Sequence, residues 1–201
     1  AEHNGGTHMT FEDMGILRVI PGITIYDVSD QVQFAAALRG AHERGGLTYI
    51  RTIRKAPKRR LYTADTDFGD SGARVLREGS DISLFACGIE VAEALEAADR
   101  LSEKGISAEV VDVFRIKPLD DSVLLESARR TGAVVTCENH NVINGMGSAV
   151  AELLAENQPT PQYRIGVRER FGQVGTTDWL MGDYGLTATD ISTAAEKLLR
   201  K

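Results

Sequence analysis

Short runs of β-branched and aromatic residues alternate along the chain with longer segments of helical periodicity. The predicted strands are bounded by glycine, proline or polar clusters and occupy residues 23–27, 47–53, 82–87, 108–114, 133–137 and 163–167. The predicted helices follow them at residues 32–44, 90–104, 121–130, 147–156 and 191–200. A repeated strand-then-helix order is typical of mostly parallel sheets with helices on both faces. The sequence therefore predicts an α/β fold.

Two local features refine this prediction. The runs 82–87 and 133–137 are apolar without alternation, which indicates strands that are buried on both faces. Thr187 with Asp190, and Thr10 with Asp13, have the spacing of a capping box in which Asp replaces Glu. We expect a helix to begin at each of these places.

The chain divides into two units of unequal content. Residues 1–60 hold two strand signals and two helical signals, whereas residues 73–201 hold a full alternating set. The stretch that begins with the basic run 55–60 shows no period, and we assign residues 61–72 to a linker. Because the first unit reaches a helix before any strand, we expect its first strands to lie upstream of residue 1.

Composition and charge exclude several classes of protein. Hydrophobic residues make up 42% of the 201 residues, which is too many for a disordered chain. A net charge of −6 with one short basic run argues against a nucleic-acid partner. No apolar run approaches the length of a membrane helix and no signal peptide is apparent, so we expect a cytoplasmic protein without a membrane partner. Cys87 and Cys137 end apolar runs and are interpreted as buried thiols, and no metal-ligand spacing is present.

Several motifs occur in a fixed order along nearly the whole chain. In the first unit they are Gly5-Gly6-Thr7-His8, Phe11-Glu12-Asp13 and Leu17-Arg18-Val19-Ile20-Pro21. In the second unit they are Val75-Leu76-Arg77-Glu78-Gly79, Ile116-Lys117-Pro118-Leu119-Asp120, Thr136-Cys137-Glu138-Asn139-His140, the run 145–152 and Tyr184-Gly185-Leu186. Together these motifs resemble the transketolase family of thiamine-diphosphate enzymes. The resemblance implies the second half of a pyrimidine-binding α/β domain, followed by a C-terminal α/β domain of transketolase type with a mostly parallel sheet.

The resemblance also implies a cofactor and a partner. Family members bind thiamine diphosphate and a divalent metal such as Mg²⁺ between the diphosphate domain of one chain and the pyrimidine domain of another. The Gly-Asp-Gly signature of the diphosphate domain and the glutamate that activates the aminopyrimidine are not found here in a matching context. We therefore expect a homodimer, or a heteromer with a subunit that carries the diphosphate-binding domain. We assign no cofactor or metal ligand to this chain, and we expect the isolated chain to be inactive.

His8 is the predicted catalytic residue. It follows a glycine-rich loop and precedes a predicted helix, where an imidazole can donate to substrate oxygens. By resemblance it matches the histidine that contacts the substrate beside the thiamine adduct, and the alternative is a surface loop residue. Asn4 stands where transketolases carry an aspartate that binds a sugar hydroxyl, and the alternative is a turn-forming Asn-Gly. This departure, with Gly6 and Met9 in place of the usual proline and glutamine, puts the standard ketose-phosphate specificity in question.

Two arginines are further candidates for substrate binding. Arg54 ends a predicted strand and matches the family arginine that binds the sugar phosphate, a task suited to a planar, bidentate donor. Its alternative is a solvated residue at the head of the basic run. Arg51 lies three residues earlier, so strand alternation predicts that it turns away from the pocket. Arg18 resembles an arginine of the deoxyxylulose-phosphate synthases, and its alternative is a cation at a helix end.

Two further patterns have a structural and a chemical interpretation. Gly145 and Gly147 before a helix could bind a nucleotide phosphate, but Val150 occupies the place of the third glycine, which favours a tight strand-to-helix turn. His140 beside Glu138 could be a lone ligand or an acid–base group, and we interpret it as a loop or interface residue.

The predicted function is the C-terminal portion of a transketolase-type enzyme that transfers a two-carbon ketol unit between phosphorylated sugars. His8 would hydrogen-bond the substrate oxygens and Arg54 would hold the phosphate. One alternative is a deoxyxylulose-phosphate synthase that acts on pyruvate. Another is a noncatalytic dimerisation module of a split thiamine-diphosphate enzyme.

Overall fold

The computed structural model describes residues 8, 10–53 and 57–200. Seven helices occupy Asp13–Leu17 (α1), Gln31–Arg44 (α2), Glu90–Ser102 (α3), Asp121–Thr131 (α4), Met146–Asn157 (α5), Thr177–Tyr184 (α6) and Ala188–Leu199 (α7) in this described part. Its eight strands occupy Thr24–Asp27 (β1), Thr48–Arg51 (β2), Arg74–Arg77 (β3), Ile82–Ala86 (β4), Ala108–Asp112 (β5), Arg115–Lys117 (β6), Val134–Asn141 (β7) and Gln162–Val167 (β8).

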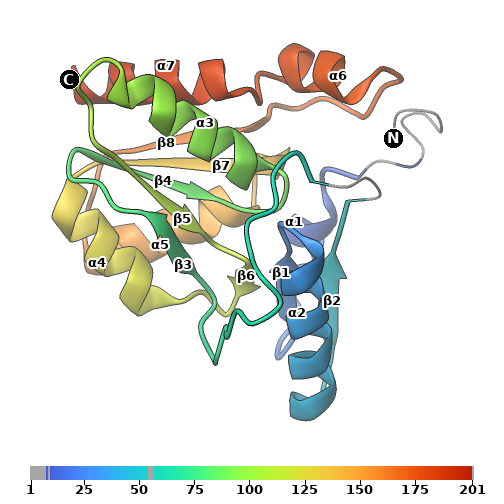
Figure 1. The fold of residues 1–201 in the computed structure, drawn as a ribbon. Coiled ribbons are helices and arrows are strands. Elements are labelled where there is room, and N and C mark those ends of the chain that lie inside the picture. The colour runs from blue at the N-terminus through green and yellow to red at the C-terminus, as the bar shows by residue number, and fades with distance from the viewer. Residues whose placement is uncertain (1–7, 9, 54–56, 201) are drawn as a thin grey trace.

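The larger sheet has five strands in the order β3-β5-β4-β7-β8 (Figure 1). Three of its four strand pairings are parallel, and the pairing of β3 with β5 is antiparallel. Helices α3 and α7 cover one face of this sheet, and α4 and α5 cover the other (Figure 1). The central strand β4 is buried along its whole length. The predicted mostly parallel α/β fold is confirmed.

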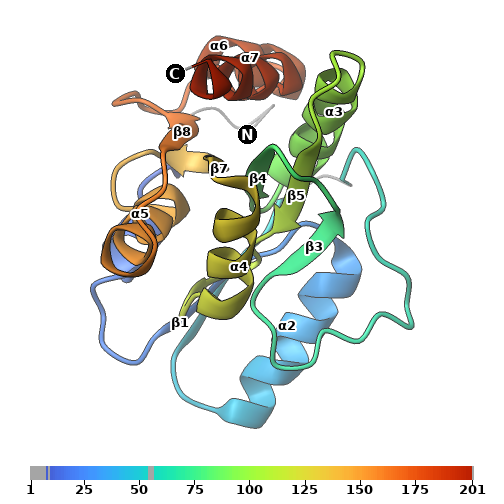
Figure 2. The same ribbon diagram turned by 90° about the vertical axis from the view of Figure 1, so that its left-hand side faces the viewer.

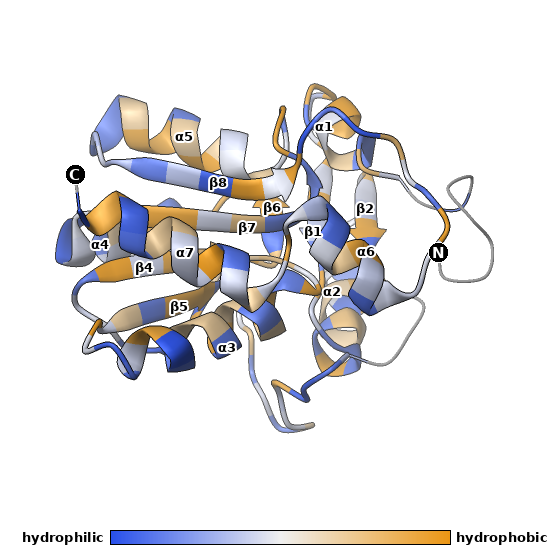
Figure 3. Cartoon of the chain, turned by 90° about the horizontal axis from the view of Figure 1, so that it is seen from above, coloured by the Kyte–Doolittle hydropathy of each residue, from blue (hydrophilic) through white to orange (hydrophobic). Residues whose placement is uncertain are grey.

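The covering helices are amphipathic. Because their apolar sides pack on both faces of the sheet, the central strands are apolar on both faces. Seen from above, α3 and α7 carry hydrophobic and hydrophilic residues side by side (Figure 3). Val91, Ala94 and Leu101 of α3 and Ile191 of α7 are buried against one face of the sheet. Leu124 and Val150 are buried on the opposite face. Burial of apolar surface on both faces is the main force that holds this layered arrangement together.

The smaller sheet lies, with α2, at one end of the larger one (Figures 1 and 2). Its order is β2-β1-β6, with β1 parallel to β2 and antiparallel to β6. Strand β6 comes from the second predicted unit, so the small sheet includes strands from both units. In the predicted linker Tyr62 is buried, and the ring of Phe68 lies edge-on to Tyr62 and to Phe114. The two units therefore share a continuous packed junction, and the boundaries proposed from the sequence stay a prediction.

The six predicted strands and five predicted helices are all present, with small changes at their ends. The capping box at Thr187 is confirmed, and its helix begins at Ala188 rather than at residue 191. The capping box at Thr10 is wrong. Helix α1 begins at Asp13 after Glu12, because the Thr10 hydroxyl donates to the Glu12 carboxylate and the carbonyl of Phe11 accepts from the amide of Asn141.

Three other observations bear on the sequence interpretation. Cys87 and Cys137 are buried free thiols, as predicted. Strands β3 and β6 and helix α6 were not predicted. Across the described residues, no helix has both the length and the apolar character needed to cross a bilayer.

Candidate functional site

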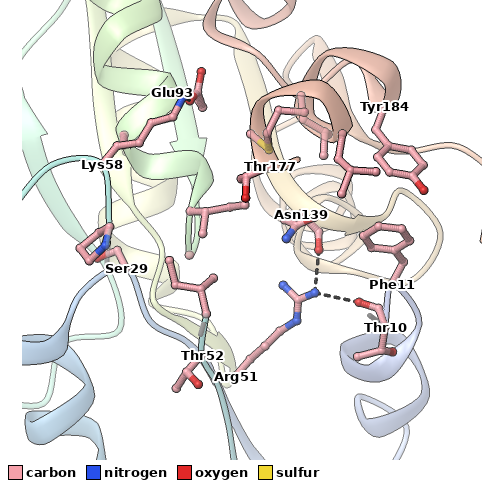
Figure 4. Close-up of a pocket in the computed structure, with 18 of the residues that line it drawn as sticks. Thr10, Phe11, Ser29, Arg51, Thr52, Lys58, Glu93, Asn139, Thr177 and Tyr184 are labelled. Atoms are coloured by element: carbon pink, nitrogen blue, oxygen red, sulfur yellow. Dashed lines mark hydrogen bonds and ion pairs between the residues drawn. The ribbon is translucent and has the colours of Figure 1, made fainter. Parts of the chain in front are cut away.

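A groove of about 1020 Å³ lies between the small sheet and the helices α3 and α6 (Figure 4). Its walls come from strand β2, the segment before α1, the turn before α3 and the helix α6. The apolar part of the lining includes Phe11, Ile89, Leu180, Met181 and Leu186. The polar part includes His8, Thr10, Arg51, Lys58, Asn139 and Thr177. A groove with an apolar wall and a few convergent polar groups is the usual form of a small-molecule site.

His8 lies on the wall of this groove and is exposed. Three residues later, Phe11 is buried. The ring of Phe11 lies edge-on to Tyr184 at a centroid distance of 5.2 Å. The predicted catalytic histidine thus stands where a ligand in the groove could reach it. Its catalytic role stays a prediction.

Asn4 and Arg54 lie outside the described residues. The groove is lined by the nearest described residues on either side of Arg54, which are Thr52, Ile53 and Pro57. The predicted roles of Asn4 and Arg54 in substrate binding therefore stay predictions.

Arg51 lines the groove, so the prediction that it turns away is wrong. Strand β2 ends at Arg51, and two carboxylates draw the side chain toward the groove. Its Nε donates to Asp13 Oδ2 at 3.0 Å and its Nη1 donates to Asp27 Oδ2 at 3.3 Å. Its Nη2 donates to the carbonyls of Thr10 at 2.9 Å and Asn139 at 2.7 Å. Four hydrogen bonds from one guanidinium join β2 to three other segments, which are residues 10–13, β1 and β7, at the edge of the groove.

Asp27 is the more buried partner of Arg51. Burial raises the pKa of Asp27, while Arg51 and a hydrogen bond with Cys87 oppose that rise. Gly88 has a φ of 55°, and a Cβ at this position would lie 2.6 Å from Asp27 Oδ1. Glycine is therefore required here by both the backbone conformation and the close approach of the carboxylate.

His140 is fully buried, so its interpretation as a loop or interface residue is wrong. Its Nε2 accepts from the amide of Gly15 at 3.2 Å, and its Nδ1 donates to the carbonyl of Asn141 at 2.7 Å. Burial lowers the pKa of His140, which agrees with this neutral tautomer. Asp13 Oδ1 lies 3.8 Å from His140 Nε2 and has no hydrogen-bond partner among the described residues. The imidazole joins α1 to the end of β7 rather than facing a ligand.

Glu138 explains the two glycines at the start of α5. Its carboxylate accepts from the amides of Met146 at 2.6 Å and Gly147 at 2.9 Å, so it occupies the helix N-terminus where a phosphate would bind. A Cβ at Gly145 would lie 2.1 Å from Glu138 Oε2, and one at Gly147 would lie 3.0 Å from Oε1. The tight strand-to-helix turn favoured by the sequence is confirmed. Burial raises the pKa of Glu138 to about 7, against the lowering effect of the two amides.

Arg18 lies outside the groove, against the loop that leads into α5. It donates to Asn144 O and Oδ1, both at 3.0 Å, to Gly145 O at 3.3 Å and to Glu152 Oε2 at 2.6 Å. These contacts at the end of α1 agree with its structural alternative. Its proposed contact with substrate stays a prediction.

Sequence reasoning missed the carboxylates Asp13 and Asp27, the contact at Asn139 and the wall formed by α6. These residues meet only because elements distant in the sequence pack together. The one usable signal was Gly88 directly after a buried strand, a position that often marks a close approach of another group.

A diphosphate cofactor and its metal require clustered oxygen ligands for the metal and cations that can pair with the phosphates. Among residues 8, 10–53 and 57–200, no group of three or more His, Cys, Asp or Glu side chains is placed to hold a metal ion. Lys58 and Arg59 also line the groove. Arg51, whose side chain is 12% exposed, is already paired with two carboxylates. Its charge is therefore not available to neutralise a diphosphate.

Comparison with known proteins agrees with these features. The family described as transketolase, C-terminal domain, matches residues 71–191. A 6-deoxy-6-sulfo-D-fructose transketolase subunit, SqwH, from Clostridium sp. (strain MSTE9) is 48% identical over 201 residues, which are 100% of this chain and 62% of that protein. A 1-deoxy-D-xylulose-5-phosphate synthase 1 from Geobacter sulfurreducens is 36% identical over 203 residues, covering 98% of this chain and 31% of that protein.

A solved structure described as a split gene transketolase, inactive beta4 tetramer, is 41% identical. It superimposes with a TM-score of 0.90 over 97% of this chain and 63% of that chain. The present chain therefore spans less than two thirds of the length of each of these three proteins.

Proposed function

Because the chain belongs to the transketolase family, we propose that it is the C-terminal portion of one subunit of a split transketolase-type enzyme. The proposed reaction is transfer of a two-carbon ketol unit between phosphorylated sugars. The observation that carries this proposal is the 48% identity with a sulfofructose transketolase subunit along the entire chain. The exposed His8 on the wall of a groove supports it.

The proposed partner is a subunit that carries the diphosphate-binding domain. The family cofactor, thiamine diphosphate with a divalent metal, supplies a carbon nucleophile when bound. Because no metal-ligand cluster is present among the described residues, we propose that its ligands lie in other parts of the enzyme. The proposed tasks of this chain are to bind and orient the sugar and to hold its oxygens.

His8 and Arg54 divide the recognition of the substrate in this proposal. A neutral or protonated imidazole at His8 donates a hydrogen bond to oxygens of the substrate. Arg54 binds the terminal anion of the sugar through its planar fork. Asn4 in place of the usual aspartate presents an amide to a sugar hydroxyl and carries no charge.

A ketose with a terminal sulfonate is a second candidate substrate, favoured by the name of the Clostridium relative. Sulfonate and phosphate both offer three oxygens to a guanidinium, and they differ in charge at neutral pH. The similarity to a deoxyxylulose-phosphate synthase keeps a reaction on pyruvate as an alternative. Because the similar split-gene transketolase structure is described as an inactive tetramer, a noncatalytic assembly role for this chain is a further alternative.

The test is ketol transfer by the complete enzyme, reconstituted from this subunit and its diphosphate-domain partner. Matched ketoses with a 6-phosphate, a 6-sulfonate or a free 6-hydroxyl serve as donors. His8→Ala should lower kcat/KM about 100-fold, which equals about 2.7 kcal/mol of transition-state stabilisation. Arg54→Lys should raise KM for the two anionic donors and leave the free-hydroxyl donor almost unchanged.

The outcomes separate the alternatives. Condensation of pyruvate without ketol transfer would favour the synthase reaction. An assembled complex that turns over no substrate would favour the noncatalytic module. Wild-type turnover by His8→Ala would return His8 to a surface loop residue.

A further inference from the structure

The Arg51 guanidinium bonds the segment after His8 both to the large sheet and to α1. Its Nη2 bridges the carbonyls of Thr10 and Asn139, and Thr10 is only two residues from His8 (Figure 4). Two carbonyl oxygens repel each other unless a donor lies between them. Arg51 supplies that donor, and together with the hydrogen bond from the Asn141 amide to the Phe11 carbonyl it holds the segment before α1 against the end of β7.

The orientation of this bridge is fixed from the opposite side of the guanidinium. Nε and Nη1 donate to Asp13 and Asp27, which lie on α1 and β1. The side chain of Arg51 is only 12% exposed, and its partners Asp13 and Asp27 are 10% and 2% exposed. A planar group that is bonded on both edges and largely buried has little freedom to rotate.

We propose that Arg51 is a positioning residue that fixes the His8 segment in the groove, an inference that rests on the proposed role of His8. Four of the five N–H donors of Arg51 are used by Asp13, Asp27 and two carbonyls, so we assign it to positioning rather than to substrate binding. It acts through the carbonyl of Thr10, which it holds in place. The position of Thr10 in turn limits where His8, two residues earlier, can lie in the groove. A shift of about 1 Å in a group that contacts the reacting atoms can cost about 100-fold in rate.

Arg51→Lys is the informative variant. Lysine keeps one positive charge beside the two buried carboxylates, so the fold is not left with uncompensated charges. Its single nitrogen cannot reach both carboxylates and both carbonyls, so the bridge between Thr10 and Asn139 is lost. Arg164→Lys is the matched control, because Arg164 also donates to a carbonyl and a side chain, Val142 O at 2.8 Å and Ser148 Oγ at 3.1 Å, and lies outside the groove.

The first measurement is hydrogen exchange in the protein, followed in peptides that cover residues 8–14. Arg51→Lys should speed exchange in these peptides at least about tenfold, and peptides from β4 and α3 should stay unchanged. Arg164→Lys should leave residues 8–14 as in the wild type. Unchanged exchange at residues 8–14 in Arg51→Lys would overturn the proposal.

The second measurement is a double-mutant cycle in the reconstituted enzyme. Arg51→Lys should lower kcat about 10- to 100-fold with KM nearly constant, and in a His8→Ala background it should lower kcat by less than about twofold. Multiplicative effects of the two substitutions would refute action through His8. If the wild-type enzyme shows no ketol transfer, the proposed function is refuted. That result differs from unchanged hydrogen exchange and from multiplicative effects, which refute only the role of Arg51.

Discussion

Replacement of Glu138 by glutamine should remove one component of the pH dependence of stability. Glu138 is fully buried, and it caps α5 through the amides of Met146 and Gly147. Glutamine has nearly the shape of the protonated side chain and stays neutral at every pH. The variant therefore isolates what ionisation of Glu138 does to the folded protein.

The sign and size of the effect follow from the pKa of Glu138. Burial raises this pKa from 4.5 to about 7, so the folded protein holds the proton more tightly than the unfolded chain. The stabilising contribution is complete below about pH 4.5 and is lost as the pH rises through about 7. A rise from 4.5 to about 7 corresponds to about 3 kcal/mol of unfolding free energy.

The assay is urea unfolding of the wild type and of Glu138→Gln at several pH values between about 5 and 8. The wild type should lose about 2–3 kcal/mol relative to the variant across this range. His140 and Asp27 interact with the charge of Glu138, so their titration contributes to the difference, whereas Asp112 titrates in both proteins and largely cancels. A control variant, Thr136→Val, changes a buried neighbour on β7 without a titrating group, and its difference from the wild type should be constant with pH.

A constant difference for Glu138→Gln would refute this reasoning. A difference of opposite sign would mean that the two amides and the N-terminus of α5 stabilise the carboxylate more than burial destabilises it.

Four further expectations can be tested directly. Gly145→Ala should cost about 2–3 kcal/mol in urea unfolding, because its Cβ would meet Glu138 Oε2 at 2.1 Å, whereas Gly182→Ala meets nothing within 4 Å and should not destabilise the protein. Tyr62→Phe removes a 2.6 Å hydrogen bond to Asp112 Oδ2. Because this hydrogen bond opposes the rise of the Asp112 pKa to about 6, NMR titration should show a higher pKa of Asp112 in the variant. Thr187→Ala should lower the unfolding free energy by about 1 kcal/mol, and Thr187→Ser should retain the capping box. Titration calorimetry of the 201-residue chain with Mg²⁺ should show no micromolar binding of thiamine diphosphate, and a micromolar Kd would contradict the assignment of its ligands to other parts of the enzyme.

The large sheet could be predicted because its signals are local. Residues 82–87 and 133–137 are apolar without interruption, and each became a strand that is buried by helices on both faces. The hydrophobic effect favours burial of these apolar runs, so they form the central strands between the helix layers. The Thr187 capping box was recognisable for the same reason, since both partners lie within one helical turn.

The short elements could not be predicted because they have no period of their own. Strand β6 has three residues, and its partner β1 lies about ninety residues earlier in the chain. Strand β3 has four residues and lies at the edge of the large sheet. Helix α6 contains Gly182 and polar residues between its apolar ones, which weakens any helical pattern. Such elements form because existing strands and helices offer them partners.

The sequence by itself determined the order of strands and helices, the α/β class, the family resemblance and the histidine that now lies on the wall of the groove. It did not determine which charges meet. The resemblance gave Arg54 and Arg18 as substrate-binding residues, and only the tertiary structure brought Arg51 to the groove and His140 into the interior. The physical reason is that Arg51 is held by Asp13, Asp27 and Asn139, which lie 38, 24 and 88 residues away. Periodicity reports the burial of a side chain within its own element, whereas a buried charge is placed by partners from other elements, and these partners are known only after the chain has folded.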